Sequence, residues 1–450
     1  MSNFVPHDGW VCQAYRYALD PSPRQEQMLR SHAGASRFAW NWGLARCQQR
    51  YADQGRWYSA VDLHKLWNAT KRADPALAWW DSNSKCVYQE AFRDLDRALR
   101  DYIKSRRGER QGKRLGFPRP KKRGRCKDSF RFSTGAMRCA GRTVTLPRLG
   151  AVSTHEPTRK LARRLEEGTA RILSATVSRA AQRWFVSFHV EVRRQVPARR
   201  PRDGSAIGVD LGVRTLLTGV DDRGQVVTVP GPRALRASLR RLRRASRAYS
   251  RTARGSANRK KAAARLARIH ARVANVRADA LHKATTQLAS RYQTVVVEDL
   301  NVTGMLASRR LARAVADQGF GQARRMLGYK TTWNGGQLIT AGRWYPSSKT
   351  CSGCGWRKPS LALSERTFVC TGCGLVLDRD QNAAANLLRL GIGTASAAGT
   401  GPAAGPTPRG AAVRPGLARR AALNQEPGVP SGSKTGTAAG QPAAAGVCAH

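Results

Sequence analysis

Four cysteines near the C-terminal end of the sequence have the spacing of a metal site. Cys351 and Cys354 form one CxxC pair, and Cys370 and Cys373 form a second pair after fifteen intervening residues. Two CxxC turns at this distance can close a tetrahedral set of thiolates around one zinc ion. The sequence therefore predicts a structural zinc site, and the acids that follow it within a few residues indicate that the zinc fold holds a carboxylate in place.

Three acidic residues stand at positions that favour a second, catalytic metal site. Asp210 ends a short apolar strand, Glu298 ends the apolar strand of YQTVVVEDLNV, and Asp380 begins the closing helix. A charge at the end of an apolar strand is costly to desolvate and usually has a cation or a hydrogen-bond network beside it. Three hard oxygen donors suit Mg²⁺ or Mn²⁺ rather than zinc, and two such ions can drive phosphodiester hydrolysis.

Each of these acids also has a structural interpretation. Asp210 could be a turn residue, Glu298 a partner in a salt bridge at the strand end, and Asp380 the N-cap of the closing helix. Asp299 and Asp378 are close rivals for the same site. The catalytic interpretation is preferred because three acids at matching places in one topology are hard to obtain by accident.

The helix that follows Asp380 favours this residue over Asp378. Asn382 and Asn386 are four residues apart and therefore lie on one helix face. The alanines of residues 383–385 between them would let the helix lie close to a sheet.

The elements that must position these acids begin at residue 206. The pattern predicts a meander of three strands at residues 207–210, 215–220 and 225–229, then a basic helical hairpin, a buried strand at 292–302, a helix at 309–333, a strand at 337–341 and a closing helix at 381–390. This order is that of an RNase-H-like α/β domain. The three acids would then meet at the carboxyl ends of neighbouring strands.

The N-terminal half predicts two kinds of structure. Residues 24–105 have the periodicity of amphipathic helices. Residues 129–192 alternate apolar and polar side chains with a period of two, which predicts a small antiparallel barrel or sheet that residues 15–19 could join.

The charge of the chain points to a polyanionic partner. Lys and Arg number 80 against 29 Asp and Glu, a net charge of +51. Such an excess favours nucleic acid. A membrane surface is the competing partner, but no apolar run is long enough to span a bilayer and the N-terminus has no signal segment, so we expect no membrane association.

Two segments concentrate this charge. Residues 106–127 contain eleven Lys or Arg and one acid, and sixteen Lys or Arg without any acid lie between Pro230 and Asp279. The second segment keeps apolar residues at helical spacing on both sides of Gly255, which predicts the basic hairpin. A merely solvated face is the alternative, but the lack of interleaved acids favours contact with phosphates.

The other six cysteines have no framework spacing, as expected for reduced thiols in a cytosol. They are Cys12, Cys47, Cys86, Cys126, Cys139 and Cys448. We therefore expect a cytoplasmic protein, and the abundance of Arg over Lys is typical of a GC-rich bacterial genome.

At these motifs the chain resembles TnpB, the RNA-guided nuclease encoded by insertion sequences and related to the type V CRISPR effectors. The resemblance is carried by GVDLGVRTL around Asp210, VVVEDLNV around Glu298, and WYPSSKTCSGCG and CTGCGLVLDRDQNAAANLL around the cysteines. YALDPSPRQEQMLRSHAGASRFAWNWGLA and GFPRPKKR extend it into the N-terminal half. It covers nearly the whole chain up to about residue 390.

The resemblance implies a RuvC-type nuclease site of Asp210, Glu298 and Asp380 that uses Mg²⁺ or Mn²⁺, with a zinc-bearing segment inserted near the end of that domain. It implies a guide RNA transcribed from the element's own end, which directs cleavage of double-stranded DNA next to a short adjacent motif. The protein is expected to be a monomer or weak dimer associated with the bacterial nucleoid.

The expected fold class is α/β, with a RuvC-like domain, an inserted zinc segment, and an N-terminal small β-barrel that carries an inserted helical subdomain. The expected domains are a wedge-like barrel (1–23 and 106–204), a helical recognition subdomain (24–105), a nuclease domain (205–343 and 375–390), a zinc segment (344–374) and a disordered tail (391–450).

Two other functions would use the same features. A guide-dependent repressor or a binding accessory of transposition would bind nucleic acid without cleaving it. A transposase that joins strands itself would use similar acids on a similar fold. The presence of all three acids favours the endonuclease.

Overall fold

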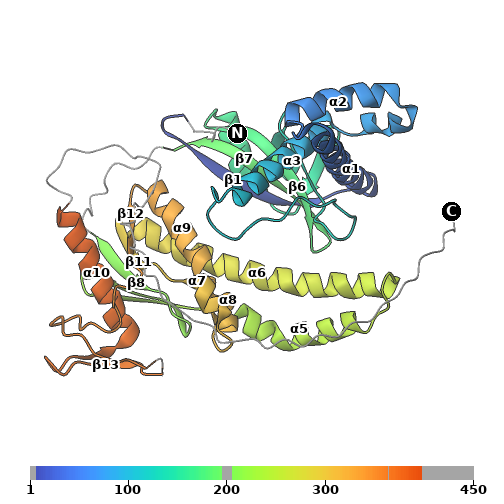
Figure 1. Cartoon of the computed structure of the whole chain (residues 1–450). Coiled ribbons are helices and arrows are strands. Elements are labelled where there is room, and N and C mark those ends of the chain that lie inside the picture. The colour runs from blue at the N-terminus through green and yellow to red at the C-terminus, as the bar shows by residue number, and fades with distance from the viewer. Residues whose placement is uncertain (1–6, 195–204, 363, 398–450) are drawn as a thin grey trace, which may run out of the picture. The chain divides into compact units, whose positions relative to one another are not determined.

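The computed structural model describes residues 7–194, 205–362 and 364–397, and for residues 393–397 it describes the backbone alone (Figure 1). The residues before and after 195–204 form two parts with separate sheets, and each part is described by itself. None of the described helices is long and apolar enough to cross a membrane.

The N-terminal part is built on one antiparallel sheet of seven strands in the order β2-β6-β7-β1-β5-β4-β3. The strands are β1 (Trp10–Asp20), β2 (Ser129–Phe132), β3 (Arg138–Ala140), β4 (Thr143–Leu146), β5 (Gly150–Thr154), β6 (Ala170–Ala180) and β7 (Arg183–Arg193). The first strand pairs with β7 over most of its length and with β5 at its end. Residues 15–19 therefore join the sheet as predicted, while its closure into a barrel stays a prediction.

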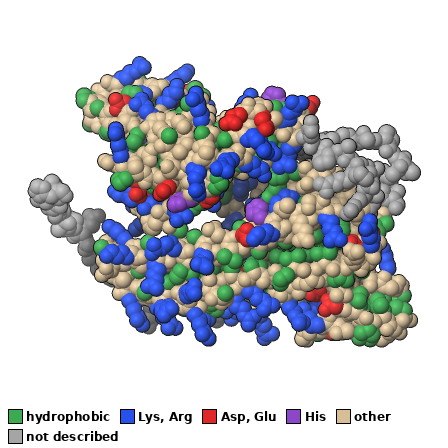
Figure 2. All heavy atoms as spheres, turned by 180° about the vertical axis from the view of Figure 1, so that it is seen from behind, with side chains coloured by type: hydrophobic (Ala, Val, Ile, Leu, Met, Phe, Trp, Pro, Cys, Tyr) green, Lys and Arg blue, Asp and Glu red, His purple; other side chains and the backbone are tan. Residues whose placement is uncertain are grey.

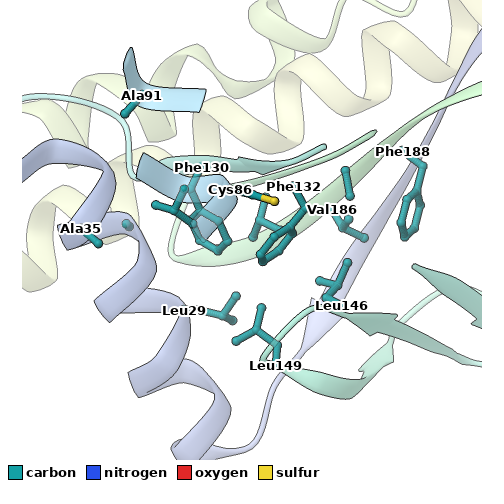
Figure 3. Close-up of a cluster of buried hydrophobic side chains, with 14 of the residues drawn as sticks. Leu29, Ala35, Cys86, Ala91, Phe130, Phe132, Leu146, Leu149, Val186 and Phe188 are labelled. Carbon is teal, nitrogen blue, oxygen red and sulfur yellow. The ribbon is translucent and has the colours of Figure 1, made fainter. Parts of the chain in front are cut away.

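Helices of the same part cover this sheet and share its core. They are α1 (Pro23–Gln54), α2 (Ala60–Ala73), the 3-10 helix η1 (Pro75–Ser82), α3 (Lys85–Arg106) and α4 (Arg159–Glu166). Ser22 starts α1 with a capping box, and Gly55 ends it in the left-handed conformation at φ 68°. Figure 3 shows Leu29 of α1 beside Phe132 of β2 and Leu146 of β4 in one apolar cluster.

The C-terminal part contains a five-stranded sheet in the order β10-β9-β8-β11-β12. The strands are β8 (Ala206–Asp210), β9 (Thr215–Asp221), β10 (Val226–Pro230), β11 (Thr294–Glu298) and β12 (Gln337–Ala341). The first three strands pair antiparallel, whereas β11 runs parallel to both β8 and β12. The predicted meander extended by parallel strands is confirmed. In β8 and β11 each residue is buried except the terminal acid.

Helices lie on both faces of this sheet. They are α5 (Ala234–Ser250), α6 (Ala257–Arg291), α7 (Val302–Ala307), α8 (Ala312–Gln318), α9 (Phe320–Trp333) and α10 (Arg379–Ala397). Val295 and Val297 of β11 pack with leucines of α6 and α9 on one face. Val296 points to the other face, where it packs with Leu387 of α10. This alternation follows from the period of two along a strand.

Two helices of this part differ from their predicted extents. The single helix expected at residues 309–333 is divided into α8 and α9 at Gly319, which adopts φ 72°. The closing helix continues to Ala397, so the predicted tail does not begin at residue 391. The missing side chain of Gly391 lets the helix pass close to the sheet here, because a Cβ would lie 2.3 Å from Val296 Cγ2. Residues 398–450 of the predicted tail lie outside the described residues.

A small hairpin of β13 (Thr367–Val369) and β14 (Val376–Asp378) leads directly into α10. Phe368 is fully buried between Cys351 and Cys370, with Trp356 and Leu375 packed against them. The cysteine-bearing segment thus has a small core of its own beside the start of α10.

We predict that Gly208→Ala destabilises the C-terminal part. A Cβ at this position in β8 would lie 2.1 Å from the Ala384 carbonyl oxygen and 2.3 Å from the Leu388 nitrogen, both in the backbone of α10. Backbone cannot yield as a flexible side chain can, so we expect a loss of at least about 1–3 kcal/mol in urea unfolding.

The matched control is Gly321→Ala, which adds the same methyl group in α9 where no atom lies within 4 Å. It should leave stability unchanged or raise it by up to about 1 kcal/mol, since alanine favours helix over glycine. Equal stability of the two variants would contradict the close approach of α10 to β8.

Candidate active site

The three predicted acids come together at one edge of the five-stranded sheet. Val209 of β8 pairs with Val297 of β11, so the next residues, Asp210 and Glu298, end their strands at the same edge of the sheet. Asp380 lies in the first turn of α10. All three line a cavity of about 250 Å³, together with Leu211, Gly212, Val213, Leu300, Met305, Leu311, Ser348, Arg366, Arg379 and Ala383.

Gly212 leaves the space between two of these carboxylates open. A Cβ added to it would lie 3.6 Å from Asp380 Oδ2 and 3.9 Å from Asp210 Oδ2, and only 2.8 Å from the Thr215 carbonyl oxygen. The two carboxylates therefore face the same small volume, and a glycine is required beside them.

The spacing of the acids differs from that of the cysteines. Among the described residues, the four cysteines form the group whose possible ligand atoms all lie within 4.8 Å of one another. The carboxylates of Asp210, Glu298 and Asp380 share a cavity without being so tightly clustered.

Asp378 has a structural role that leaves Asp380 available. Its Oδ1 accepts hydrogen bonds from the backbone N–H groups of Asp380 (2.9 Å) and Gln381 (3.2 Å). Asp378 is therefore the residue that caps α10, and the alternative in which Asp380 is the N-cap is wrong. The reason is geometric, since α10 begins at Arg379, two residues earlier than predicted.

Asp299, the other rival, is engaged by two arginines. Its Oδ2 accepts a hydrogen bond from Arg343 Nη2 at 2.8 Å, and Arg324 donates to its Oδ1. The hydrogen bond from Arg324 is the main cause that lowers the pKa of Asp299, and Arg343 adds to it. This carboxylate is thus neutralised by its own partners, and Glu298 is the acid that faces the cavity of Asp210.

The pKa values of all three acids in the cavity are raised. Burial raises the pKa of Asp210 well above its ordinary value, and the nearby charges of Glu298 and Asp380 raise it further. Burial is also the main cause for Glu298 and for Asp380. The positive charge of Arg379 opposes the shift at each of the three. Such a cluster favours binding of cations or of protons.

A hydrogen-bond chain that sequence analysis missed joins Glu298 to the cysteine-bearing segment. Ser347, which is buried, donates from its hydroxyl to Glu298 Oε1. The backbone carbonyl of Ser347 accepts from Asn386 Nδ2 at 2.8 Å. A serine beside the WYP motif carries no pattern that would have identified this role.

The two asparagines of α10 hold the cysteine-bearing segment on the helix. Asn382 Nδ2 donates to the Thr350 carbonyl at 2.7 Å, and its Oδ1 accepts from the Ser352 N–H at 2.9 Å. Asn386 Nδ2 reaches the same Thr350 carbonyl at 2.6 Å. Both asparagines are almost fully buried. Their predicted position on one helix face is therefore used to fix the segment that begins the zinc fold.

The four cysteines are placed as a zinc site requires. The Sγ atoms of Cys351 and Cys373 are 3.7 Å apart, and those of Cys354 and Cys370 are 3.5 Å apart. A tetrahedral zinc ion with Zn–S bonds of 2.3 Å would space its sulfurs by about 3.8 Å. The residues present therefore fit a structural zinc ion, as predicted.

The basic hairpin predicted from residues 231–278 is present as α5 and α6. A groove of about 660 Å³ between these helices is lined by Ser238, Arg241, Arg244, Ala245, Ala248, Lys261, Ala262, Arg265, Arg268, Ile269 and Arg272. Lys and Arg side chains crowd the lower edge of Figure 2, where Figure 1 places α5. The groove contains no acid, so it is a candidate surface for phosphates.

Three family models match the chain. Residues 187–309 match a model described as a probable transposase, residues 320–387 match the Cas12f1-like TNB domain, and residues 11–56 match a helix-turn-helix domain. In this chain the last of these ranges comprises the strand β1 and the single long helix α1.

The chain is similar over most of its length to several bacterial proteins. It is 38% identical over 472 residues to "Putative RNA-guided DNA endonuclease Rv2885c" of Mycobacterium tuberculosis, covering 98% of this chain and 97% of that protein. A protein with the same descriptive name from Streptomyces pristinaespiralis is 36% identical, with 86% and 91% covered. InsQ of Escherichia coli is 30% identical, with 84% and 92% covered.

Among solved structures, the chain is similar to Cas12f1 in a complex with a single guide RNA and target DNA. The TM-score is 0.52 at 11% identity, with 84% of this chain and 99% of that chain covered. At this identity the likeness concerns the fold alone. Together with the relatives, it confirms the resemblance found in the sequence. The chain belongs to the TnpB family.

We predict that Cys351→Ser lowers both zinc content and stability. A lost thiolate would open the four-sulfur cluster and free the segment that holds α10, so the thermal midpoint should fall by several degrees and zinc measured by mass spectrometry should fall below one ion per chain. Cys126→Ser, outside the cluster, is the control. A zinc-free Cys351→Ser protein with unchanged stability would refute the structural role.

We predict that Asp210→Asn stabilises the protein at neutral pH when divalent metals are removed. The pKa of Asp210 is raised in the folded state, so the wild-type carboxyl contributes stability only at acidic pH and loses it as the pH rises through that pKa. The neutral amide avoids this loss, and each kcal/mol recovered should raise the thermal midpoint by about 2–4 °C.

The gain should shrink as the pH is lowered toward the ordinary aspartate value of 3.8. Asp8→Asn removes the same charge from an exposed position and controls for the change in net charge. A variant at residue 210 that is less stable than wild type at neutral pH without metal would contradict this electrostatic account.

Proposed function

We propose that the protein is an RNA-guided DNA endonuclease of an insertion sequence that hydrolyses phosphodiester bonds at Asp210, Glu298 and Asp380 with divalent metal ions. The observation that carries this proposal is the convergence of three carboxylates from β8, β11 and α10 on one cavity. Each carboxylate is expensive to keep ionised there, which is reasonable if its role is to bind cations.

The order and direction of the strands support an RNase-H-like, RuvC-type nuclease domain. The antiparallel meander of β8, β9 and β10 is extended by the parallel strands β11 and β12. We assign this domain to residues 205–343 and 375–390 and the zinc segment to residues 344–374. The relatives named as RNA-guided DNA endonucleases support a nuclease function for the chain.

The chemistry of the donor set fits Mg²⁺ or Mn²⁺. These ions prefer oxygen ligands, and a pair of them about 3.5–4 Å apart stabilises the attacking and leaving oxygens in phosphodiester hydrolysis. Acids that flank two ions need not lie as close together as ligands of one ion. Asp210, Glu298 and Asp380 would hold the metal ions, and the Ser347 hydroxyl would orient Glu298.

The zinc segment has a positioning role in this proposal. Asn382 and Asn386 fasten the segment to the first turns of α10, the helix that carries Asp380. Ser347 links the same segment to Glu298. A folded zinc segment would therefore fix two of the three catalytic carboxylates relative to each other.

The partners we propose are a guide RNA from the end of the element and a double-stranded DNA target. Base pairing would read the sequence, while the protein supplies a cationic surface and reads a short adjacent motif. The groove between α5 and α6 and the basic segment of residues 106–127 are suited to phosphate contact. Residues 24–105 would form a recognition subdomain, and residues 1–23 and 106–204 a wedge-like domain.

The test is to express the protein with its native flanking DNA, sequence the RNA that co-purifies, and assay Mg²⁺-dependent cleavage of a DNA that matches the RNA's 3′ portion. We expect one discrete RNA and cleavage that chelation of the metal stops. Asp210→Asn should reduce cleavage by about 10³-fold or more, since charge stabilisation by metal is worth several kcal/mol.

RNA binding by Asp210→Asn should remain nearly unchanged, because the carboxylate does not contact the RNA in this proposal. If the variant loses RNA binding, the acid has a structural role. Discrete RNA without cleavage by the wild-type protein would instead favour a guide-dependent repressor, and random nucleic-acid fragments would indicate generic polyanion binding by the net charge of +51.

A further inference from the structure

A second cavity lies beside the cavity of the three acids. It has a volume of about 260 Å³ and is lined by Leu211, Glu298, Asp299, Leu300, Asn301, Val302, Thr303, Phe320, Gly321, Arg324 and Arg343. Leu211, Glu298 and Leu300 belong to the walls of both cavities. The two cavities therefore adjoin, and a nucleic-acid strand bound at the three acids could extend into the second cavity.

Two arginines from separate elements meet in this second cavity. Arg324 comes from α9 and Arg343 follows β12, and each donates to a different oxygen of Asp299. The side chains of Arg324 and Arg343 are 44% and 48% exposed, whereas that of Asp299 is 28% exposed. The carboxylate thus lies beneath two guanidinium groups that remain open to solvent.

The hydrogen bonds to Asp299 leave both arginines with further N–H donors. A guanidinium has five N–H donors in a fixed fork, and the recorded bonds to Asp299 use one terminal nitrogen of each. Two positive charges against one negative charge leave a net positive charge on the cluster. Glu298 in the shared wall is the other acid of this cavity, and it is engaged by Ser347 and faces the three-acid site.

An exposed aromatic side chain stands next to this cluster in the chain. Trp344, which directly follows Arg343, is 89% exposed. A tryptophan with so little packing contributes almost nothing to the core, whereas an open indole face is the platform on which an unpaired base stacks. One of the two guanidinium groups suited to a phosphate, that of Arg343, thus neighbours in the chain an indole suited to a base.

From this arrangement we infer that Arg324 and Arg343, held in place by Asp299, bind a backbone phosphate next to the cleaved linkage of a single-stranded DNA segment, while Trp344 stacks on a base of the same segment. The inference rests on the proposed endonuclease function and deepens it. Asp299 is a positioning residue, which acts by orienting the two guanidinium groups rather than by binding metal.

The experiment uses the full-length protein with its co-purified guide RNA and DNA targets in which one phosphate is replaced by a neutral methylphosphonate. The replacement is moved one linkage at a time along each strand around the cleavage position. In the native protein, replacing one particular linkage close to the cleaved bond should lower the cleavage rate by about 10- to 100-fold. This is the effect of losing a charged hydrogen bond.

The variant Arg324→Gln/Arg343→Gln should cleave the unmodified target more slowly by a similar factor, and the same methylphosphonate should then cause no further loss. Arg325 is an exposed neighbour on α9, and the methylphosphonate should slow cleavage by Arg325→Gln as much as cleavage by the native protein. Arg324→Lys/Arg343→Lys keeps the charges and serves if the glutamine variant fails to fold. It should recover only part of the rate, because lysine lacks the planar fork.

The role of Trp344 is tested in the same assay with an abasic nucleotide. Removing one base near the cleavage position should slow the native protein and the Trp344→Phe variant, but not Trp344→Ala. An equal abasic effect in all three proteins would overturn the stacking assignment.

Two outcomes would separate this inference from the function on which it rests. If the native protein cleaves normally but no single methylphosphonate interferes, or if the interference persists in the glutamine variant, the phosphate site is wrong and the endonuclease stands. If no guided target is cleaved at all, the proposed function is overturned and this inference with it.

Discussion

The close approach of one helix backbone to one strand underlies the rest of the candidate site. At Gly208 the backbone of α10 lies where any side chain on β8 would have to stand. This contact places the first turn of α10, and with it Asp380, at the edge where β8 and β11 end. Without it, Asp210 and Glu298 would meet at that edge through strand pairing alone, with the third carboxylate elsewhere.

The three carboxylates have raised pKa values, and a neighbouring arginine limits the shift. Burial raises the pKa values of Asp210, Glu298 and Asp380, the charges of Glu298 and Asp380 raise that of Asp210 further, and Arg379 partly offsets each shift. Bound cations would therefore stabilise this cluster of carboxylates. Under the proposed function, stability and activity would be opposed at this site, as is common at active sites.

Hydrogen bonds from buried side chains link the cysteine-bearing segment to the acid cluster. Asn382 and Asn386 form hydrogen bonds with backbone groups of the segment. The hydroxyl of Ser347 donates a hydrogen bond to Glu298. These groups are buried, so an unmade hydrogen bond among them would cost more than the bond itself contributes. A metal ion bound by the four cysteines would in this way influence the acid cluster without touching it.

The sequence by itself determined the order of the strands in the C-terminal part, the cysteine pairs and the family, because each depends on local spacing or on motifs. The strands β8 and β11 are buried except for their last residue, and two CxxC pairs at this spacing can close around one ion. Only the tertiary structure separated the surroundings of the rival acids. Asp378 accepts hydrogen bonds from the N–H groups that begin α10, whereas Asp380 faces the cavity. Asp299 differs from Glu298 because it pairs with Arg324 and Arg343, which are distant in the sequence. Ser347 and the left-handed break at Gly319 were likewise invisible in the sequence, because long-range contacts and a single backbone angle leave no periodic pattern.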